Sequence, residues 1–236
     1  MRQPTTKDEK TKKILHIVMK LHILDHQPTL VNKYLAELRD VEVQKDSMRF
    51  RRNLERVGEI MAYEVSKTLH YTPRVVRTPL GDAEVQMIDD KIVLATVFRA
   101  GLPLHQGFLN YFDNAENAFV SAYRKYSDEQ NFSIEVEYIA CGELEGKTLL
   151  LVDPMLATGS SFLAAYDALV AHGGRPAHTH LVAVLASQKG VDTILENLPS
   201  DDVTLWCATV DEHLNEHKYI VPGLGDAGDL CYGPKL

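Results

Sequence analysis

Residues 149–161, with the sequence LLLVDPMLATGSS, place one acidic residue between an apolar run and a run of small, hydroxyl-bearing residues. This order predicts a short buried strand, Asp153 at its carboxyl end, and a turn that opens a helix near Ser161. The first backbone N–H groups of a helix have no partner within it, and the helix dipole is positive there, so the turn is suited to bind a phosphate. The Asp153 carboxylate can accept hydrogen bonds from two vicinal hydroxyls, and the segment therefore fits ribose 5-phosphate.

The hydroxyls of Thr158, Ser160 and Ser161 would line the rim of this turn, but the same residues also have a purely structural interpretation. Thr158 could cap the helix and Asp153 could simply end the strand, which are common roles for these residue types. We favour the phosphate-binding turn, because a cap alone does not require so many small residues in a row. A Walker loop is excluded, since the pattern GxxxxGK[ST] and its lysine are absent.

The segment from Asp211 to Asp229 matches two motif patterns whose usual interpretations fail here. His213 to His217 fits the zinc-peptidase pattern HxxEH, but Pro222 follows too soon for the required helix to continue, which favours exposed or structural histidines. Gly223 to Gly228 fits GxGxxG, but only eight residues follow it, too few for a dinucleotide-binding βαβ unit. We instead expect a glycine-rich loop whose backbone approaches a flat ligand closely.

Two arginines directly follow predicted strands. Arg99 comes after an apolar run at 92–97, and Arg124 comes after a run at 118–123. A guanidinium at a strand end can reach over the sheet edge and bind a phosphate through two parallel hydrogen bonds. A single arginine is more commonly part of a surface ion pair, but two of them beside a phosphate-binding turn favour anion binding.

Composition limits the classes of function. The chain has 236 residues, 45% of them hydrophobic, and a formal net charge of −8, which disfavours nucleic-acid binding. Its three cysteines form no CxxC motif, so we expect neither a disulfide framework nor a metal site, and a reducing cytoplasm fits. No apolar run is long enough to span a membrane. The charged residues 1–13 predict a disordered N-terminal tail rather than a signal peptide, and residues 14–236 a single domain.

Apolar patterns alternate between strand and helix periods along the chain. This alternation predicts an α/β fold with a mostly parallel central sheet, helices on both faces, and a ligand crevice at the carboxyl ends of the strands. N-terminal elements and a hairpin would form a small hood region on the margin of the sheet, and the polar stretch 125–146 would contain an arm. The predicted strands are 92–97, 118–123, 149–152, 181–186 and 203–208, the helices are 49–69, 104–112, 162–171 and 191–198, and the hairpin is 75–78 with 84–88.

Together these segments resemble the uracil phosphoribosyltransferase family of type I phosphoribosyltransferases, which join uracil to phosphoribosyl pyrophosphate (PRPP) and release UMP and pyrophosphate. The resemblance rests on RAGL at 99–102, Tyr123-Arg124, DPMLATG at 153–159 and YIVPGLGDAGD at 219–229. It implies the same α/β fold and an enzyme of pyrimidine salvage. Two alternatives remain open, a PRPP- or nucleotide-binding regulator that has lost turnover, suggested by Pro103 and the unusual stretch 126–146, and transfer to another base.

The resemblance also implies roles for individual residues. Asp153, Arg124 and Asp226 would be catalytic, and uracil would bind at Ile220, Gly225, Asp226 and Ala227. Mg²⁺ would be carried mainly by PRPP and pyrophosphate, with no dedicated protein site. Family members are usually homodimers or larger homo-oligomers, and some respond to GTP as an effector. PRPP would contact Arg99, Arg124, Asp153, Pro154, Met155, Leu156, Ala157, Thr158, Gly159, Ser160, Ser161 and Asp226.

Overall fold

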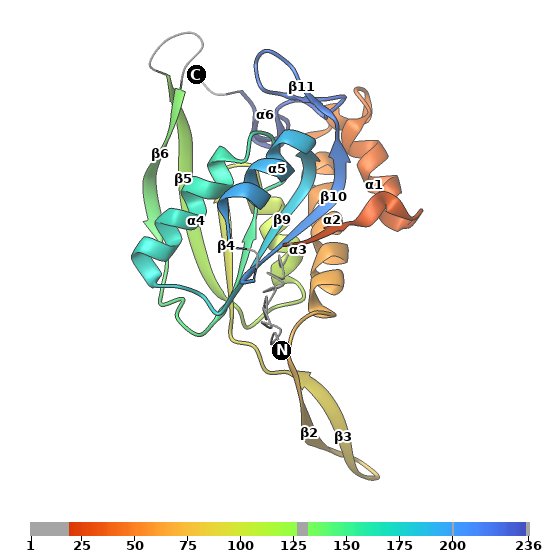
Figure 1. The fold of residues 1–236 in the computed structure, drawn as a ribbon. Coiled ribbons are helices and arrows are strands. Elements are labelled where there is room, and N and C mark those ends of the chain that lie inside the picture. The colour runs from red at the N-terminus through yellow and green to blue at the C-terminus, as the bar shows by residue number, and fades with distance from the viewer. Residues whose placement is uncertain (1–18, 127–131, 200, 235–236) are drawn as a thin grey trace, which may run out of the picture.

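The fold is described from a computed structural model of the chain, which places residues 19–126, 132–199 and 201–234, with backbone only for 122–126 and 132–135. The proposed tail at 1–13 lies outside the described residues. The main sheet has the strand order β1-β10-β9-β7-β4-β5-β6, with β8 added beside β9 (Figure 1). All neighbouring strands are parallel except β5 and β6, which confirms the predicted mostly parallel sheet.

The strands of this sheet are short and apolar at its centre. The bounds of β4, β7, β9 and β10 agree with the predicted strands to within three residues, β1 and β8 were not predicted, and the two strands at the edge are discussed below. The strands are β1 (Lys20–Ile23), β4 (Ile92–Phe98), β5 (Glu116–Tyr126), β6 (Phe132–Ala140), β7 (Thr148–Val152), β8 (Met155–Leu156), β9 (His178–Ser187) and β10 (Val203–Asp211).

Helices cover both faces of the sheet, as its continuous apolar strands require. In β7, Leu150 and Val152 face a core formed with the helices α1, α2 and α3, whereas Leu149 and Leu151 face a second core formed with α4 and α5. Neighbouring residues of one strand thus point into opposite layers. The helices are α1 (Leu30–Arg39), α2 (Ser47–Ser66), α3 (Gly101–Leu109), α4 (Ser160–Gly173), α5 (Gln188–Asn197) and α6 (Ala227–Tyr232).

Helix α2 illustrates how the local sequence specifies an element. Apolar residues recur every three or four positions at Phe50, Leu54, Val57, Met61 and Val65, and these five are buried in the first core. The Asp46 side chain accepts a hydrogen bond from the backbone N–H of Arg49 and caps the helix. Helix α1 was not predicted, although Thr29 and Asn32 form a reciprocal capping box at its start, which is a signal readable from sequence.

The edge formed by β5 and β6 differs from the prediction. Strand β5 runs on to Tyr126 instead of ending at Tyr123, because it pairs with the antiparallel strand β6 in the stretch predicted to hold an arm. Arg124 therefore lies within β5, opposite Ile134, and does not follow a strand end as expected. Residues 127–131, between the two strands, lie outside the described part of the chain.

The predicted hairpin consists of β2 (Tyr71–Thr78) and β3 (Gly81–Ile88), which form a separate two-stranded sheet. It lies on the margin of the main sheet, as expected, but projects from the amino end of β4 (Figure 1). The phosphate-binding turn lies at the carboxyl ends of the strands, at the opposite edge, so this hairpin does not cover it.

Candidate active site

The segment after β7 forms the predicted strand, turn and helix. Helix α4 begins at Ser160, and Gly159 occupies the N-cap position with φ +85°, in the left-handed region. A Cβ atom on Gly159 would lie 2.9 Å from Cγ2 of Thr193, so both the backbone and the space require glycine there. Gly159 rather than Thr158 is therefore the N-cap, although the Thr158 hydroxyl accepts the N–H of Ser160, the first amide of α4, in a long hydrogen bond of 3.4 Å.

The residues of this turn divide into buried and partly buried groups. Pro154 and Leu156 are buried, and the Pro154 carbonyl accepts hydrogen bonds from the N–H groups of Val184 and Leu185 in β9. These two residues thus fasten the turn to the sheet and can offer a ligand only backbone groups. The partly buried residues of the turn are Asp153, Met155, Ala157, Thr158, Ser160 and Ser161. The Thr158 hydroxyl donates to Ser160 Oγ at 3.1 Å, so the rim hydroxyls are in contact.

Asp153 is the acidic residue at the end of β7. Its backbone N–H donates to the Val182 carbonyl at 3.1 Å, and its Oδ1 accepts the N–H of Met155 at 3.1 Å. Burial raises the pKa of the carboxyl to about 7, against a smaller opposing effect of the Met155 hydrogen bond. In the free protein this group is therefore only about half ionised near neutral pH, and a ligand that donates hydrogen bonds to the carboxylate would favour the ionised form.

Arg99 follows β4 directly, as predicted, and its guanidinium is turned toward the C-terminal segment. Its Nη2 lies 3.2 Å from Oδ1 of Asp229 and 3.3 Å from the carbonyl oxygen of Gly233. Its Nε is buried and has no hydrogen-bond partner within the described part of the chain. Gly228 lies beside it, since a Cβ atom there would be 3.7 Å from Arg99 Nη2. The structure therefore joins the strand-end arginine to the glycine-rich segment.

The glycine-rich segment follows a small two-stranded sheet of β11 (His213–Leu214) and β12 (Ile220–Val221). Asp226 then caps α6, its Oδ1 accepting the N–H of Asp229 at 2.9 Å. The segment opens a helix of six residues but no βαβ unit, which agrees with the rejection of a dinucleotide fingerprint. Among the candidate base-binding residues, Ile220 and Ala227 are buried, whereas Gly225, with φ +95°, is exposed.

The histidines of the HxxEH pattern do not lie on a helix. His213 is in β11 and His217 is in the turn that follows, and both side chains are exposed beside Glu212 and Glu216. Within residues 19–126, 132–199 and 201–234, no group of three or more His, Cys, Asp or Glu side chains is arranged to hold a metal ion. The zinc-peptidase interpretation therefore has no support in the described part of the fold.

Sequence reasoning missed two residues that touch the glycine-rich segment. Arg39, the last residue of α1, and Asp211, the last residue of β10, form an ion pair with a shortest N–O distance of 2.8 Å. Both also hydrogen-bond to Gly223. Neither residue belongs to a motif, and 172 positions separate them in the chain, so no local signal indicates the contact.

The predicted site residues thus gather at one edge of the sheet. Asp153 and its turn follow β7, Arg99 follows β4, and the glycine-rich segment follows β10 (Figure 1). Parallel strands present their carboxyl ends at the same edge, which brings these segments together. For Arg124 the structure describes only the backbone, in β5 beside β4.

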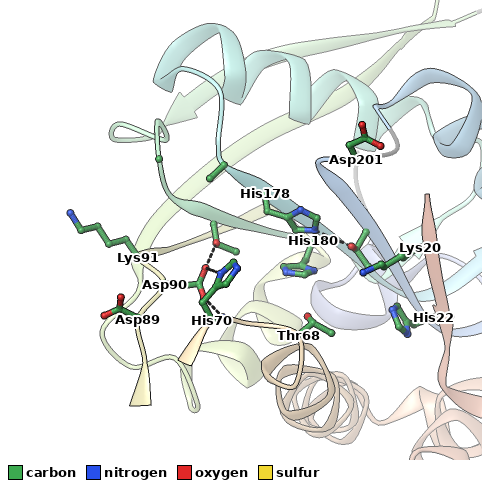
Figure 2. A pocket seen from close by; sticks show the side chains of 14 residues that line it. Lys20, His22, Thr68, His70, Asp89, Asp90, Lys91, His178, His180 and Asp201 are labelled. Atoms are coloured by element: carbon green, nitrogen blue, oxygen red, sulfur yellow. Dashed lines mark hydrogen bonds and ion pairs between the residues drawn. The ribbon is translucent and has the colours of Figure 1, made fainter. Parts of the chain in front are cut away.

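A cavity of about 660 Å³ lies at the amino ends of β1 and β9, far from this edge. Figure 2 shows His70, His178, His180 and Lys20 around it. Trp206 Nε1 donates to Nδ1 of the buried His180 at 3.1 Å, which places the hydrogen of the neutral ring on Nε2. A metal ion would need the lone pair of that nitrogen, so His180 is not placed as a ligand.

Comparisons with known proteins agree with this arrangement. The family model of uracil phosphoribosyltransferase matches residues 24–234. The uracil phosphoribosyltransferase of Porphyromonas gingivalis is 56% identical over 213 residues, covering 90% of this chain and 98% of the relative. That of Methanothermobacter thermautotrophicus is 39% identical over 217 residues, covering 91% and 96%.

A solved structure has the same fold over nearly the whole chain. The AQ2163 protein from Aquifex aeolicus superposes with a TM-score of 0.80 at 29% identity, covering 90% of this chain and 98% of that one. No helix in the described residues is both long and apolar enough to cross a membrane. The extent of the family match and the identity to its curated members show that the chain belongs to the uracil phosphoribosyltransferase family.

Proposed function

We propose that this protein transfers the phosphoribosyl group from PRPP to uracil, giving UMP and pyrophosphate. The observation that carries the proposal is the meeting of a helix start with glycine at its N-cap, an acidic strand end and a glycine-rich segment at one edge of the sheet. Relatives that bear the name of this activity are similar over nine tenths of the chain. A regulator without turnover would need the same PRPP site, and no structural feature favours it.

The turn at 153–161 is the proposed site of the ribose 5-phosphate. The amides at the start of α4 and the hydroxyls of Thr158, Ser160 and Ser161 would bind the phosphate, which the helix dipole also favours. Asp153 would accept hydrogen bonds from the two ribose hydroxyls. The buried residues Pro154 and Leu156 pack the turn against the sheet, and Met155, Ala157 and Gly159 would form the rest of the binding surface.

Uracil is assigned to the glycine-rich segment. Uracil presents the acceptor O2, the donor N3–H and the acceptor O4, and cytosine reverses the last two. Fixed backbone groups of Ile220, Gly225 and Ala227 would match uracil and leave cytosine with mispaired groups, which can give discrimination on the order of 10⁴-fold. Asp226, which caps α6, would contact both uracil and PRPP.

Pyrophosphate is assigned to Arg99 and Arg124, whose guanidinium groups would stabilise the negative charge that develops as it leaves. The residues present fit a Mg²⁺ ion carried by PRPP. Mg²⁺ favours one or two carboxylates together with phosphate oxygens and water. The Asp153 carboxylate can supply such a ligand, because among the described residues only the Met155 N–H binds it. When bound, the ion would neutralise part of the leaving-group charge. The residues themselves act mainly by orienting uracil toward the anomeric carbon.

We also propose a homodimer or larger homo-oligomer formed through the hairpin β2–β3. Tyr71, Val75 and Ile88 lie on one face of this hairpin and are exposed, and an isolated two-stranded hairpin has little stability of its own. Light scattering tests this, since Val75→Lys should lower the measured mass.

We propose GTP as an effector because the family resemblance implies it. We propose a cytoplasmic location because the three cysteines are free, as a reducing compartment would keep them. Assays of UMP formation with and without GTP test the effector.

The activity is tested by measuring UMP formation from uracil and PRPP with Mg²⁺. Asp153→Asn and Arg124→Ala should each reduce kcat/KM by about 100-fold or more, the scale of a lost transition-state contact. Asp192→Asn, at an exposed carboxylate that accepts from Gln188 on α5, is the control and should match the unmodified protein. Activity in both site variants equal to that of the control would refute the site assignment, and absence of UMP in the unmodified protein would refute the function.

A further inference from the structure

Arg39 and Asp211 form a two-pronged ion pair behind the glycine-rich segment. Arg39 Nη1 donates to Asp211 Oδ2 and Nη2 to Oδ1, both at 2.8 Å, and Nη2 also lies 3.4 Å from Thr209 Oγ1. Asp211 is only 8% exposed, so its charge is tolerable there only because it is paired. Parallel hydrogen bonds between a guanidinium and a carboxylate fix both the distance and the plane of the two groups.

The same two side chains hold the backbone of Gly223 from both sides. Its N–H donates to Asp211 Oδ2 at 3.0 Å, and its carbonyl accepts from Arg39 Nη1 at 3.1 Å. Its one backbone donor and its carbonyl are thus both bound by one ion pair. Gly223 has φ +59°, and a Cβ atom there would lie 2.0 Å from the carbonyl oxygen of Ile220, so no other residue fits this turn.

We propose that Arg39 and Asp211 are positioning residues for base recognition: by holding Gly223, they fix the backbone groups of Ile220, Gly225 and Ala227 that select uracil. The proposal rests on the assignment of uracil to this segment. Gly223 lies between those groups, three residues after the first and two before the second. Neither Arg39 nor Asp211 is assigned a contact with the base.

The physical argument concerns rigidity. Recognition by backbone groups discriminates between bases only if each donor and acceptor is held within a fraction of an ångström of its productive position. Glycines leave a segment free to adopt other conformations, and Gly223 and Gly225 both have positive φ angles. Charge-assisted hydrogen bonds to the N–H and the carbonyl of one residue hold two successive peptide groups and restrict that freedom without placing a side chain in the base site.

The test is steady-state kinetics of Arg39→Met and Asp211→Asn with uracil and with cytosine. Each variant should raise KM for uracil by about 10- to 100-fold, the range expected for losing hydrogen bonds to a charged group. The preference for uracil over cytosine in kcat/KM should fall, while KM for PRPP stays unchanged. Arg39→Lys keeps the charge but cannot make the planar double contact, so its effect on KM for uracil should be intermediate.

Arg49→Met is the matched control. Arg49 binds Glu37 of α1 through two hydrogen bonds, Nε to Oε2 at 3.0 Å and Nη2 to Oε1 at 3.2 Å, but this pair does not touch the glycine-rich segment. A purely structural role for Arg39 predicts that Arg39→Met and Arg49→Met both lower the melting temperature and leave KM for uracil unchanged. That result would overturn the proposal. If Arg39→Met does not fold, Arg39→Lys and Asp211→Asn give the same readout.

One further variant separates this proposal from the assignment of the base site. Gly225→Ala changes a residue with φ +95° in the segment itself and should raise KM for uracil whether or not the ion pair matters. If Gly225→Ala has no effect in an otherwise active enzyme, the base-site assignment fails. If Gly225→Ala raises KM and the Arg39 and Asp211 variants do not, only the positioning role fails.

Discussion

Arg99 and Asp229 form an ion pair, with Nη2 of the arginine 3.2 Å from Oδ1 of the aspartate, that links the end of β4 to helix α6. The same guanidinium nitrogen donates to the Gly233 carbonyl. The residue proposed to bind pyrophosphate is therefore oriented by the segment proposed to bind the base.

Asp229→Asn should raise KM for PRPP modestly, because the guanidinium loses a charged partner that orients it. Both side chains are more than one third exposed, so solvent screens the pair and the effect should be at most about 5-fold. Measuring KM for PRPP at low and high salt checks the electrostatic origin, since the difference from the unmodified enzyme should shrink as salt increases. An unchanged KM at low salt would contradict the orienting role.

Asp153→Asn should make the protein more stable while it lowers kcat/KM. The pKa of Asp153 is raised to about 7 in the folded state, so the folded protein binds more protons than the unfolded chain between about pH 4 and pH 7. This carboxyl therefore lowers stability as pH rises through that window, by at most about 1.4 kcal/mol per pH unit. The amide retains an acceptor for the Met155 N–H and carries no charge.

Urea unfolding at several pH values measures this effect. The stability advantage of Asp153→Asn should be small near pH 4 and reach its full value above pH 7. An advantage that does not change with pH would show that burial of the charge is not its cause.

His180 should make the protein sensitive to acid. Burial is the main reason that its pKa is lowered to about 3, and His178 nearby acts in the same direction, whereas Asp90 opposes it. The unfolded chain then binds more protons than the folded one between about pH 6.5 and pH 3, so stability falls as pH falls through this window. His22 and His178, which also line the cavity in Figure 2, have lowered pKa values and add to the effect with the same sign.

His180→Gln tests this, because glutamine is neutral and its amide oxygen can accept the Trp206 N–H. The free energy of unfolding of this variant should depend less steeply on pH below about pH 6 than that of the unmodified protein. Parallel curves for the two proteins would contradict the prediction.

Gly159→Ala should destabilise the protein and weaken PRPP binding. A left-handed conformation costs an L-residue about 1–2 kcal/mol, and the added Cβ atom would also meet Thr193 at 2.9 Å. Gly146→Ala is a matched control, since Gly146 has φ +71° but no atom within 4 Å of an added Cβ, so it reports the conformational cost alone.

Chemical unfolding of both variants and of Gly159→Ala/Thr193→Ala separates the two costs. The double variant should recover only the part of the loss that is due to Cγ2 of Thr193, because the Cβ atom of residue 193 would still lie 3.0 Å from the added Cβ atom. Equal losses in Gly159→Ala and Gly146→Ala would show that Thr193 yields without cost.

Local patterns in the sequence predict most of this fold. The strand, turn and helix at 148–173 and the amphipathic helix α2 are specified by apolar periodicity and by turn residues close together in the chain. The cap interpretation of Thr158 was wrong because Gly159, in a left-handed conformation, occupies the N-cap position instead. The end of β5 was misplaced because its extension depends on pairing with β6, which lies in a polar stretch without a clear strand pattern.

The contacts that complete the site are the part that sequence reasoning could not supply. Arg39, Asp211 and Gly223 are brought together only by the folding of α1 against the end of β10. Arg99 likewise meets Asp229, 130 positions later in the chain. The spacing of one arginine and one aspartate so far apart in the sequence does not indicate a contact, because most such pairs in a folded chain are not in contact.

The hydrogen bond from Arg39 to Gly223 spans 184 positions, so the proposed base site depends on two segments that a ribosome makes far apart in time. At about 5–20 residues per second, the ribosome adds Gly223 about 10–40 seconds after Arg39, so α1 exists for that time without its contact to Gly223. A nascent chain that has not yet released this segment can form the strand order of the sheet but not the complete base site. Premature termination anywhere before Gly223 therefore yields an inactive product, however well its core has formed.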